Sequence, residues 1–336
     1  MKKNIFLWVA VFAVGAMSSC SVDKVVDQAE ARYIGFDAFA NKVTRTKPAD
    51  FPHETFGVWG AYNSAASVVF TNQEVTYQSG DGSWSYGTPE PWVSGQTYEF
   101  AAIAPYVNGA SYNYTDNKYS FGSVTVNSGS QTDYMVADVK DVASNSGTVQ
   151  FTFNHTLSKV DFKFAPQTNT PNNWQSDIKI VVKEFTLSNV LSQGSCEFTY
   201  DAGGNTISWT GQKTEVEFKD ENDYTATYEY QTSTATSSSV SPSWLVIPQT
   251  EGTRTLSIKC DIVNTAVSPE VTVKQDATAS VTISNDWEGN THYTYIVYIG
   301  IDILGTNPYI TFDVEKVTGW TPDTSNSLNV PTTTAP

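Results

Sequence analysis

The clearest structural signal in this chain is the stretch Thr255-Leu-Ser-Ile-Lys-Cys-Asp-Ile262. Apolar Leu, Ile, Cys and Ile alternate there with Ser, Lys and Asp, which is the period of a strand with one buried and one solvated face. The same alternation recurs in 178–182, 293–301 and 310–314, and no segment shows a sustained helical stripe. Short turns rich in Gly, Asn and Asp separate these runs. We therefore expect an all-β protein built from antiparallel β-sandwiches.

The first twenty residues have the organisation of an export signal. Two lysines precede an uncharged, mostly apolar run over residues 5–17. This run is shorter than the about 20 apolar residues that span a bilayer, and it fits the apolar core of a secretory signal peptide. Small residues then lead into Cys20, as in the lipobox of bacterial lipoproteins. We predict a lipoprotein signal peptide over 1–19 and acyl chains, palmitate among them, on Cys20. An ordinary secretory signal followed by a chance cysteine is the alternative.

The charge balance argues against several classes of partner. The formal net charge is −16, while charged residues make up only 16% of the chain and aromatic residues 13%. A strongly acidic surface repels phosphate groups, which argues against nucleic acid and against docking on anionic lipid headgroups. The lipid on Cys20 would then be the attachment to a membrane.

Two cysteines remain once Cys20 is set aside. Cys196 and Cys260 both occupy apolar positions of alternating strands, so we expect both thiols to face a core. Export would permit a disulfide between them. Two buried free thiols are the other interpretation.

Polar stretches divide the chain into segments. Ala165–Gln175 is rich in Pro, Asn, Thr and Gln and has almost no apolar content. We place a boundary there, with an N-terminal β-sandwich over 46–165 and a C-terminal β-sandwich over 166–320. The tail 321–336 is rich in Pro, Thr and Asn and is predicted to lack a fixed conformation in the isolated subunit.

Signals for catalysis and metal binding are scarce. The three histidines, His53, His155 and His292, are far apart in sequence, and no H-E-x-x-H, G-x-S-x-G, Walker-type or CxxC motif is present. We expect His155 to be a hydrogen-bonded structural residue at a strand end. We also expect no enzymatic activity, no cofactor and no metal site.

The three arginines are distributed unevenly along the chain. Arg32 and Arg45 precede the first predicted domain, and Arg45 lies in the polar stretch 42–50, where exposure would suit a protease. Arg254 begins a strongly alternating strand whose ladder should protect it. An arginine-specific protease is therefore predicted to cut this chain at one end only.

Six segments spread along the chain share one family resemblance. The most specific is Phe151-Thr-Phe-Asn-His-Thr-Leu-Ser-Lys-Val-Asp-Phe-Lys-Phe164, with its F-x-H-x-L-S-K pattern. The others are Tyr98–Tyr106, Asp133–Asp138, Leu245–Thr250, Trp287 leading into Tyr293-Thr-Tyr295, and Ile310–Val314 followed by Trp320. In this order they resemble the fimbrillins, the type V pilin subunits of Bacteroidales. The resemblance covers nearly the whole chain after Cys20.

The resemblance implies two tandem transthyretin-like β-sandwiches, exported as a lipoprotein to the outer membrane and displayed in a fimbrium. In polymerising members an arginine-specific protease removes the N-terminal strand. On this chain Arg45 and Thr46 would flank the cut, and 20–45 would be the propeptide. Arg32 fits less well, because a cut there would leave the strand Tyr33–Val43 in place.

Assembly by strand exchange is implied as well. Within Tyr33–Val43, Ile34 and Phe36 share the parity of a core-facing strand. Loss of this strand would expose unpaired backbone groups and an apolar groove, which a strand from another subunit could fill.

The candidate donor strand is the tail 321–336, in which Leu328 and Val330 alternate with polar residues and Pro331 limits pairing. Other fimbrial subunits would then be the partners, with host or bacterial surface molecules as adhesive ligands. The role of tip, stalk or anchor stays open. The alternative function is a surface lipoprotein that does not polymerise, keeps Cys20 and binds a host or glycan ligand.

Overall fold

The computed structural model describes nine ranges of the chain and shows an all-β protein. Every named element within them is a β-strand, which confirms the class predicted from the alternating pattern. None of the described residues forms a helix long and apolar enough to span a bilayer. The ranges are 33–40, 51–128, 131–167, 177–200, 206–210, 215–229, 234–249, 252–301 and 308–318.

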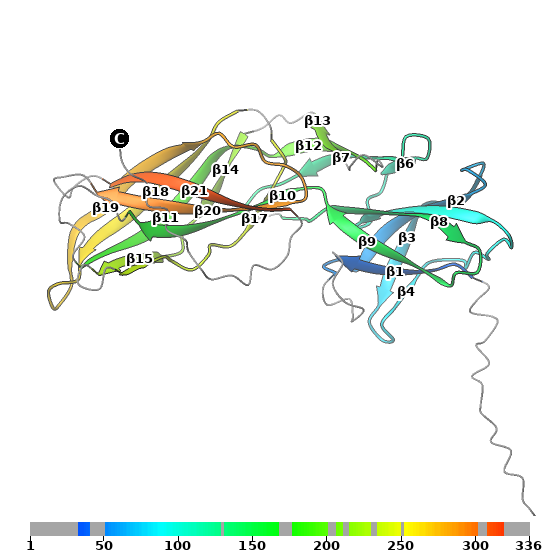
Figure 1. Ribbon diagram of the computed structural model, residues 1–336, viewed down its shortest axis with the longest axis horizontal. Coiled ribbons are helices and arrows are strands. Elements are labelled where there is room, and N and C mark those ends of the chain that lie inside the picture. The colour runs from blue at the N-terminus through cyan, green and yellow to red at the C-terminus, as the bar shows by residue number, and fades with distance from the viewer. Residues whose placement is uncertain are drawn as a thin grey trace, which may run out of the picture.

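A seven-stranded sheet forms one end of the elongated molecule (Figure 1). Its strand order is β1-β9-β8-β5-β2-β3-β4; β1 and β9 are parallel, and the other neighbours are antiparallel. The two edge strands, β1 and β4, contact each other, so the sheet closes around its own core. The strands are β1 (Gly35–Ala40), β2 (Thr55–Tyr62), β3 (Ser67–Gln78), β4 (Ser83–Ser85), β5 (Thr97–Ala104), β8 (Met135–Ala143) and β9 (Thr148–His155).

The inward face of this sheet is packed largely with aromatic rings. Gly60 on β2 makes part of this packing possible, because a Cβ there would lie 2.7 Å from the ring of Phe100 and 2.8 Å from that of Phe70. Contacts that close are not available to any other residue, so the two rings approach the sheet only over a glycine.

A small central sheet lies between the two ends of the molecule (Figure 1). Its order is β13-β12-β7-β6, and it packs on the outer face of the first sheet. The hydroxyl of Tyr119 donates to the carbonyl of Ala137 on β8 and accepts a hydrogen bond of 3.1 Å from the amide of Ala102 on β5. The strands are β6 (Ser111–Asn113), β7 (Lys118–Thr125), β12 (Gln193–Thr199) and β13 (Thr206–Thr210).

Two further sheets enclose the second core at the other end of the molecule. One has the order β17-β10-β20-β21, with β10 and β20 parallel; the other has the order β16-β15-β11-β18-β19, with β14 also paired to β11. The strands are β10 (Ser158–Pro166), β11 (Ile178–Leu191), β14 (Glu215–Asp220), β15 (Tyr224–Glu229), β16 (Thr234–Thr236), β17 (Trp244–Val246), β18 (Arg254–Asn264), β19 (Val271–Ile283), β20 (Thr291–Ile301) and β21 (Pro308–Thr318).

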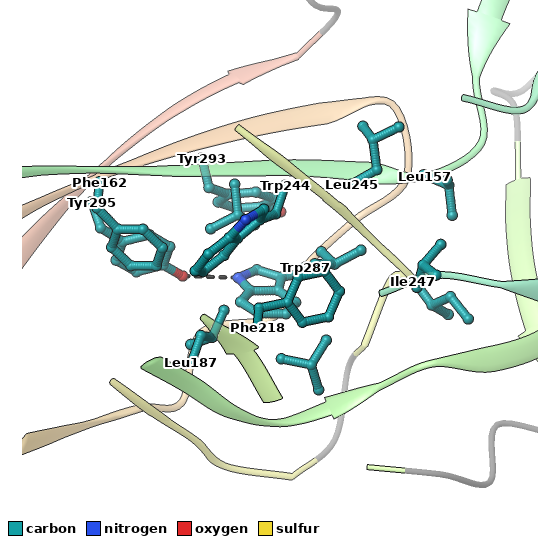
Figure 2. Close-up of a cluster of buried hydrophobic side chains, with 14 of the residues drawn as sticks. Leu157, Phe162, Leu187, Phe218, Trp244, Leu245, Ile247, Trp287, Tyr293 and Tyr295 are labelled. Carbon is teal, nitrogen blue, oxygen red and sulfur yellow. Dashed lines mark hydrogen bonds between the residues drawn. The ribbon is translucent and has the colours of Figure 1, made fainter. Parts of the chain in front are cut away.

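The alternating stretch 255–262 forms most of β18, and its apolar side chains are all buried in this core. Figure 2 shows the aromatic centre, where the indole Nε1 of Trp287 donates to the hydroxyl of Tyr295 at 2.9 Å. Both side chains are buried, and the hydrogen bond satisfies the one donor that the indole carries into the core.

Strand pairing crosses the polar stretch Ala165–Gln175 at two places. β10 begins before that stretch and ends at its second residue, Pro166, but it pairs with β17 and β20 of the second end. β7 also lies before it and pairs with β12, which follows it. Pairing therefore follows the apolar alternation of each strand, and the division into 46–165 and 166–320 stays a prediction.

Candidate strand-exchange site

β1 is an edge strand with a backbone ladder on one side. The ladder joins it to β9 in parallel, from Gly35 opposite Thr148 to Ala40 opposite Phe153. In Figure 1, β1 is the blue strand beside β9 and β4. A parallel strand at a sheet edge can leave without breaking any other strand pair, because no second strand depends on it for a complete ladder.

The opposite side of β1 is held by a few contacts with the segment after β4. The amide of Ile34 donates to the carbonyl of Glu90 at 2.8 Å, and the hydroxyl of Tyr86 donates to the carbonyl of Ile34 at 2.6 Å. A single bridge joins Tyr33 to Pro91. These contacts secure the beginning of the strand.

Alternate side chains of β1 and the residue before it point into the first core. Ile34 is 1% exposed, Phe36 4% and Ala38 3%, whereas Tyr33 is 48% exposed. The inward parity predicted for Ile34 and Phe36 is thus present in the structure. We call the space that Ile34, Phe36 and Ala38 fill the β1 groove.

Phe36 is the largest side chain in the β1 groove and lies among four other rings. Its ring centroid is 5.3 Å from that of Phe70, 5.5 Å from Tyr86, 5.8 Å from Phe151 and 5.9 Å from Phe100. Aromatic pairs at such distances contribute about 0.5–1.5 kcal/mol each beyond the burial of area. Phe36 is therefore the main anchor of the strand.

The outward face of β1 carries Asp37, opposite Gln150 in the ladder. Partial burial raises the pKa of Asp37, because desolvation disfavours its charged form. The carboxylate thus opposes docking of β1 when it is ionised.

The chain returns to the sheet beside the place where β1 ends. Phe51 packs its ring 4.9 Å from that of Phe153, the residue level with Ala40. Arg45 and Thr46 belong to the segment 41–50. The residues on either side of this segment, Ala40 and Phe51, both contact Phe153 of β9. The segment itself lies outside the described residues.

The histidine at the end of β9 is hydrogen-bonded, as the sequence predicts. His155 Nδ1 is 2.8 Å from Asp133 Oδ2, and both side chains are largely buried. Burial lowers the pKa of His53, which lies near this pair. In the described part of the chain, no three His, Cys, Asp or Glu side chains could hold a metal ion.

The third arginine is buried in the second core. Arg254 is 1% exposed, its Nη2 donates to the carbonyl of Asn285, and its Cζ lies 4.5 Å from the ring centroid of Trp287. Burial lowers the pKa of its guanidinium. Its position in the β18 ladder, opposite Ile283, shields the following peptide bond.

The two internal cysteines lie on different sheets. Cys196 is on β12 and Cys260 on β18, and both are buried free thiols. Burial raises the pKa of Cys260 to about 12 and also raises that of Cys196. Cys20, Leu328 and Val330 lie outside the described residues.

Sequence reasoning missed Ala38 and the walls of the β1 groove. Ala38 continues the parity of Ile34 and Phe36, so extending the alternation by two residues would have found it. The wall residues Phe70 and Tyr86 carry no such signal, because their contacts with β1 join segments that are distant in the chain.

A family model described as fimbrillin-like matches residues 44–315. Similar solved structures include a candidate cell adhesion protein from Bacteroides uniformis, with 16% identity, coverage of 85% of this chain and 98% of that chain, and a TM-score of 0.49. A candidate cell adhesion protein from Parabacteroides distasonis has 12% identity, coverage of 86% and 99%, and a TM-score of 0.46. A fimbrial protein from Bacteroides ovatus has 12% identity, coverage of 82% and 50%, and a TM-score of 0.36.

No curated protein matches the sequence. The family model, in contrast, spans well over half of the chain and includes all the segments on which the resemblance was based, apart from Trp320. This protein therefore belongs to the fimbrillin-like family.

Proposed function

We propose that this protein is a structural or adhesive subunit of type V fimbriae that is cut after Arg45 and assembled by strand exchange. The observation that carries the proposal is β1, an edge strand that fills an aromatic groove and directly precedes the segment containing Arg45. The family match begins at residue 44, so β1 lies outside the matched region.

Removal of β1 would create an acceptor for another strand. The edge of β9 would lose its backbone partner, and the apolar walls of the groove would meet water. Burying a side chain such as Ile34 or Phe36 is worth about 1.5–3 kcal/mol, and each ladder hydrogen bond about 0.5–1.5 kcal/mol. A strand from another subunit would recover both contributions, with register set by its alternate side chains.

Repetition of this contact would produce a filament. The acceptor surface and the donor strand are different parts of a subunit, so the contact is heterologous and need not close into a ring. We propose the tail 321–336 as the strand that this chain donates to a neighbouring subunit of the fimbrium, with Leu328 and Val330 as its inward residues.

The positions of the arginines favour processing at one end. Arg254 is buried and paired in β18, which leaves Arg32 and Arg45 as the sites in reach of an arginine-specific protease. A cut after Arg45 frees β1, whereas a cut after Arg32 alone leaves β1 joined to the rest of the chain.

Export and domain organisation complete the proposal. We propose that Cys20 is lipidated, that the lipid delivers the precursor to the outer membrane, and that the lipid leaves with the propeptide 20–45. We further propose that the chain folds as two transthyretin-like β-sandwiches, one over 46–165 and the other over 166–320. Adhesive ligands would then be molecules of host or bacterial surfaces.

N-terminal sequencing of the surface-exposed mature protein tests the proposal. We expect Thr46 as the mature N-terminus and protease-dependent, heat-resistant ladders on denaturing gels. An Arg45→Ala variant should keep β1 in the chain, even if it is cut after Arg32, and should lose the ladders, whereas an Arg32→Ala control should still begin at Thr46. Wild-type protein that stays monomeric with Cys20 as its N-terminus would contradict the proposal and favour an anchored, ligand-binding lipoprotein.

A further inference from the structure

The β1 groove is shaped for one pattern of side chains, and this pattern differs from that of the tail 321–336. Resting on the proposed strand exchange, we infer that the groove accepts a strand of the pattern aliphatic–x–aromatic–x–small from a different subunit. A second copy of this chain would offer the tail 321–336 as its donor strand. If that tail does not fit the groove, the partner that fills the groove is a different protein.

The central position of the groove suits an aromatic ring. Phe36 meets Phe70 and Phe100 edge-on, at interplanar angles of 71° and 78°, and stacks on Phe151 at 23°. Such geometry depends on the flat shape and the quadrupole of a ring. A smaller aliphatic side chain would leave part of the space empty, and packed interiors lose stability when a void forms.

The wall of the groove is built around this ring. Gly60 admits Phe70 and Phe100 at distances that no Cβ would tolerate, and these are two of the rings that hold Phe36. The rings of Phe70 and Phe100 therefore form an aromatic pocket that belongs to the acceptor, and the donor supplies only the ring that enters it.

The second inward position after Ile34, that of Ala38, is restricted to a small residue. Gly35 is at the outward parity of β1, and a Cβ there would lie 3.2 Å from the Oγ1 of the exposed Thr148, a contact that a small shift of that side chain relieves. Ala38 is buried with its Cβ inward, and a longer side chain there would overpack the core. From Ile34 onward, the groove therefore selects an aliphatic, an aromatic and a small residue at alternate positions, and it accepts any residue between them.

The tail 321–336 fits this pattern poorly. It contains no Phe, Tyr or Trp. If Leu328 takes the place of Ile34, then Val330 falls at the position of Phe36 and Pro331 at that of Asp37. Val cannot fill the aromatic pocket, and Pro has no N–H to donate to a ladder. If Leu328 instead takes the place of Phe36, Val330 falls at the position of Ala38. Leu would then leave the aromatic pocket partly empty, and Val would be larger than the residue that this position holds.

Peptide exchange on the full chain tests the inference. An arginine-specific protease should cut the folded chain after Arg32 and Arg45, which leaves the peptide 33–45 in the groove. Fluorescently labelled peptides are then added, and their binding is followed by polarisation. The set comprises peptide 33–45, its Phe36→Leu and Tyr33→Leu variants, peptide 321–336, and peptide 321–336 with Val330→Phe and Pro331→Ala.

We expect peptide 33–45 to exchange and Phe36→Leu to weaken binding at least tenfold. Tyr33→Leu, the matched control, removes an aromatic side chain that is largely exposed, and it should change binding by less than about twofold. Peptide 321–336 should not compete with peptide 33–45, and its doubly substituted form should gain binding.

Two results would overturn the inference and leave strand exchange intact: equal binding of peptide 33–45 and its Phe36→Leu variant, or binding of peptide 321–336 as tight as that of peptide 33–45. A chain that is not cut at Arg45, or that never exchanges peptide 33–45, contradicts the proposed function itself.

Discussion

Phe36 shows how a single side chain can hold an edge strand in place. Its neighbours Ile34 and Ala38 are also buried, but they are smaller, and β1 has a ladder on one side only. The stability of the docked strand is therefore concentrated at this ring and its contacts.

We expect Phe36→Ala to lower the free energy of unfolding of the uncut chain by about 3–5 kcal/mol, since it deletes a buried ring and leaves a cavity. Urea denaturation measures this change. Tyr33→Ala is the control, because Tyr33 is half exposed and should change stability by no more than about 0.5 kcal/mol. Equal effects of the two substitutions would show that Phe36 is not the anchor.

Asp37 makes the stability of β1 docking depend on pH. Its pKa is raised in the folded protein by partial burial, so the folded state binds the proton more tightly than the unfolded state does. This contribution favours folding when the group is protonated, and it falls as pH rises from the unfolded pKa through the folded pKa.

We therefore expect Asp37→Asn to raise the Tm slightly at pH 7 and to leave it nearly unchanged near pH 3.5. Calorimetry at the two pH values gives the comparison, with the exposed Asp116→Asn as a control that lacks the burial. If Asp37→Asn raised the Tm by the same amount at both pH values, desolvation of the Asp37 carboxylate would not be the cause of the increase.

At the scale of elements, the contrast between β1 and β18 determines where a protease can act. β18 pairs on both sides, with β11 and β19, and Arg254 at its start is buried. A protease needs an exposed, accessible segment, which a two-sided ladder does not provide. Arg45 precedes Phe51, where the described chain resumes beside the sheet.

Limited digestion of the folded chain with an arginine-specific protease should release fragments that end at Arg32 or Arg45 and leave the region from Thr46 onward intact. Mass spectrometry identifies the cuts. The urea-unfolded chain, used as the control, should also be cut after Arg254. A fragment that begins at Thr255 in the native digest would show that β18 does not protect this site.

At the scale of the whole molecule, the central sheet couples the two ends. Tyr119 of β7 bonds to β5 and β8 of the first sheet, and the hydroxyl of Tyr200 donates to the carbonyl of Val136 on β8 at 3.0 Å. β7 is in turn paired with β12, which continues from β11 of the second end. A pull on one end of the molecule would thus be transmitted to the other end through paired strands.

Tyr119→Phe should weaken this coupling. It leaves the amide of Ala102 and the carbonyl of Ala137 without their partner in a buried place, which costs about 1–3 kcal/mol. We expect a lower Tm and a broader calorimetric transition, whereas the exposed Tyr33→Phe should behave as the wild type. An unchanged transition for Tyr119→Phe would indicate that apolar packing alone joins the ends.

The sequence by itself determined the class of the fold and the inward face of several strands, although β20 proved to be buried on both faces. Alternation is a local property, because each residue of a strand points to the opposite face from its neighbour, so the stretch 255–262 and the pair Ile34 and Phe36 reveal their buried faces without knowledge of their partners. The scarcity of arginine and the signal around Cys20 are likewise legible in the chain alone.

Only the tertiary structure decided which strands pair and what surrounds Phe36. The neighbours of β1 are β9 and the segment after β4, both distant in sequence, and the pairing of β10 with β20 crosses the polar stretch that looked like a boundary. Such contacts depend on the closure of long loops and on the fit of whole sheets, and neither leaves a periodic trace in the sequence.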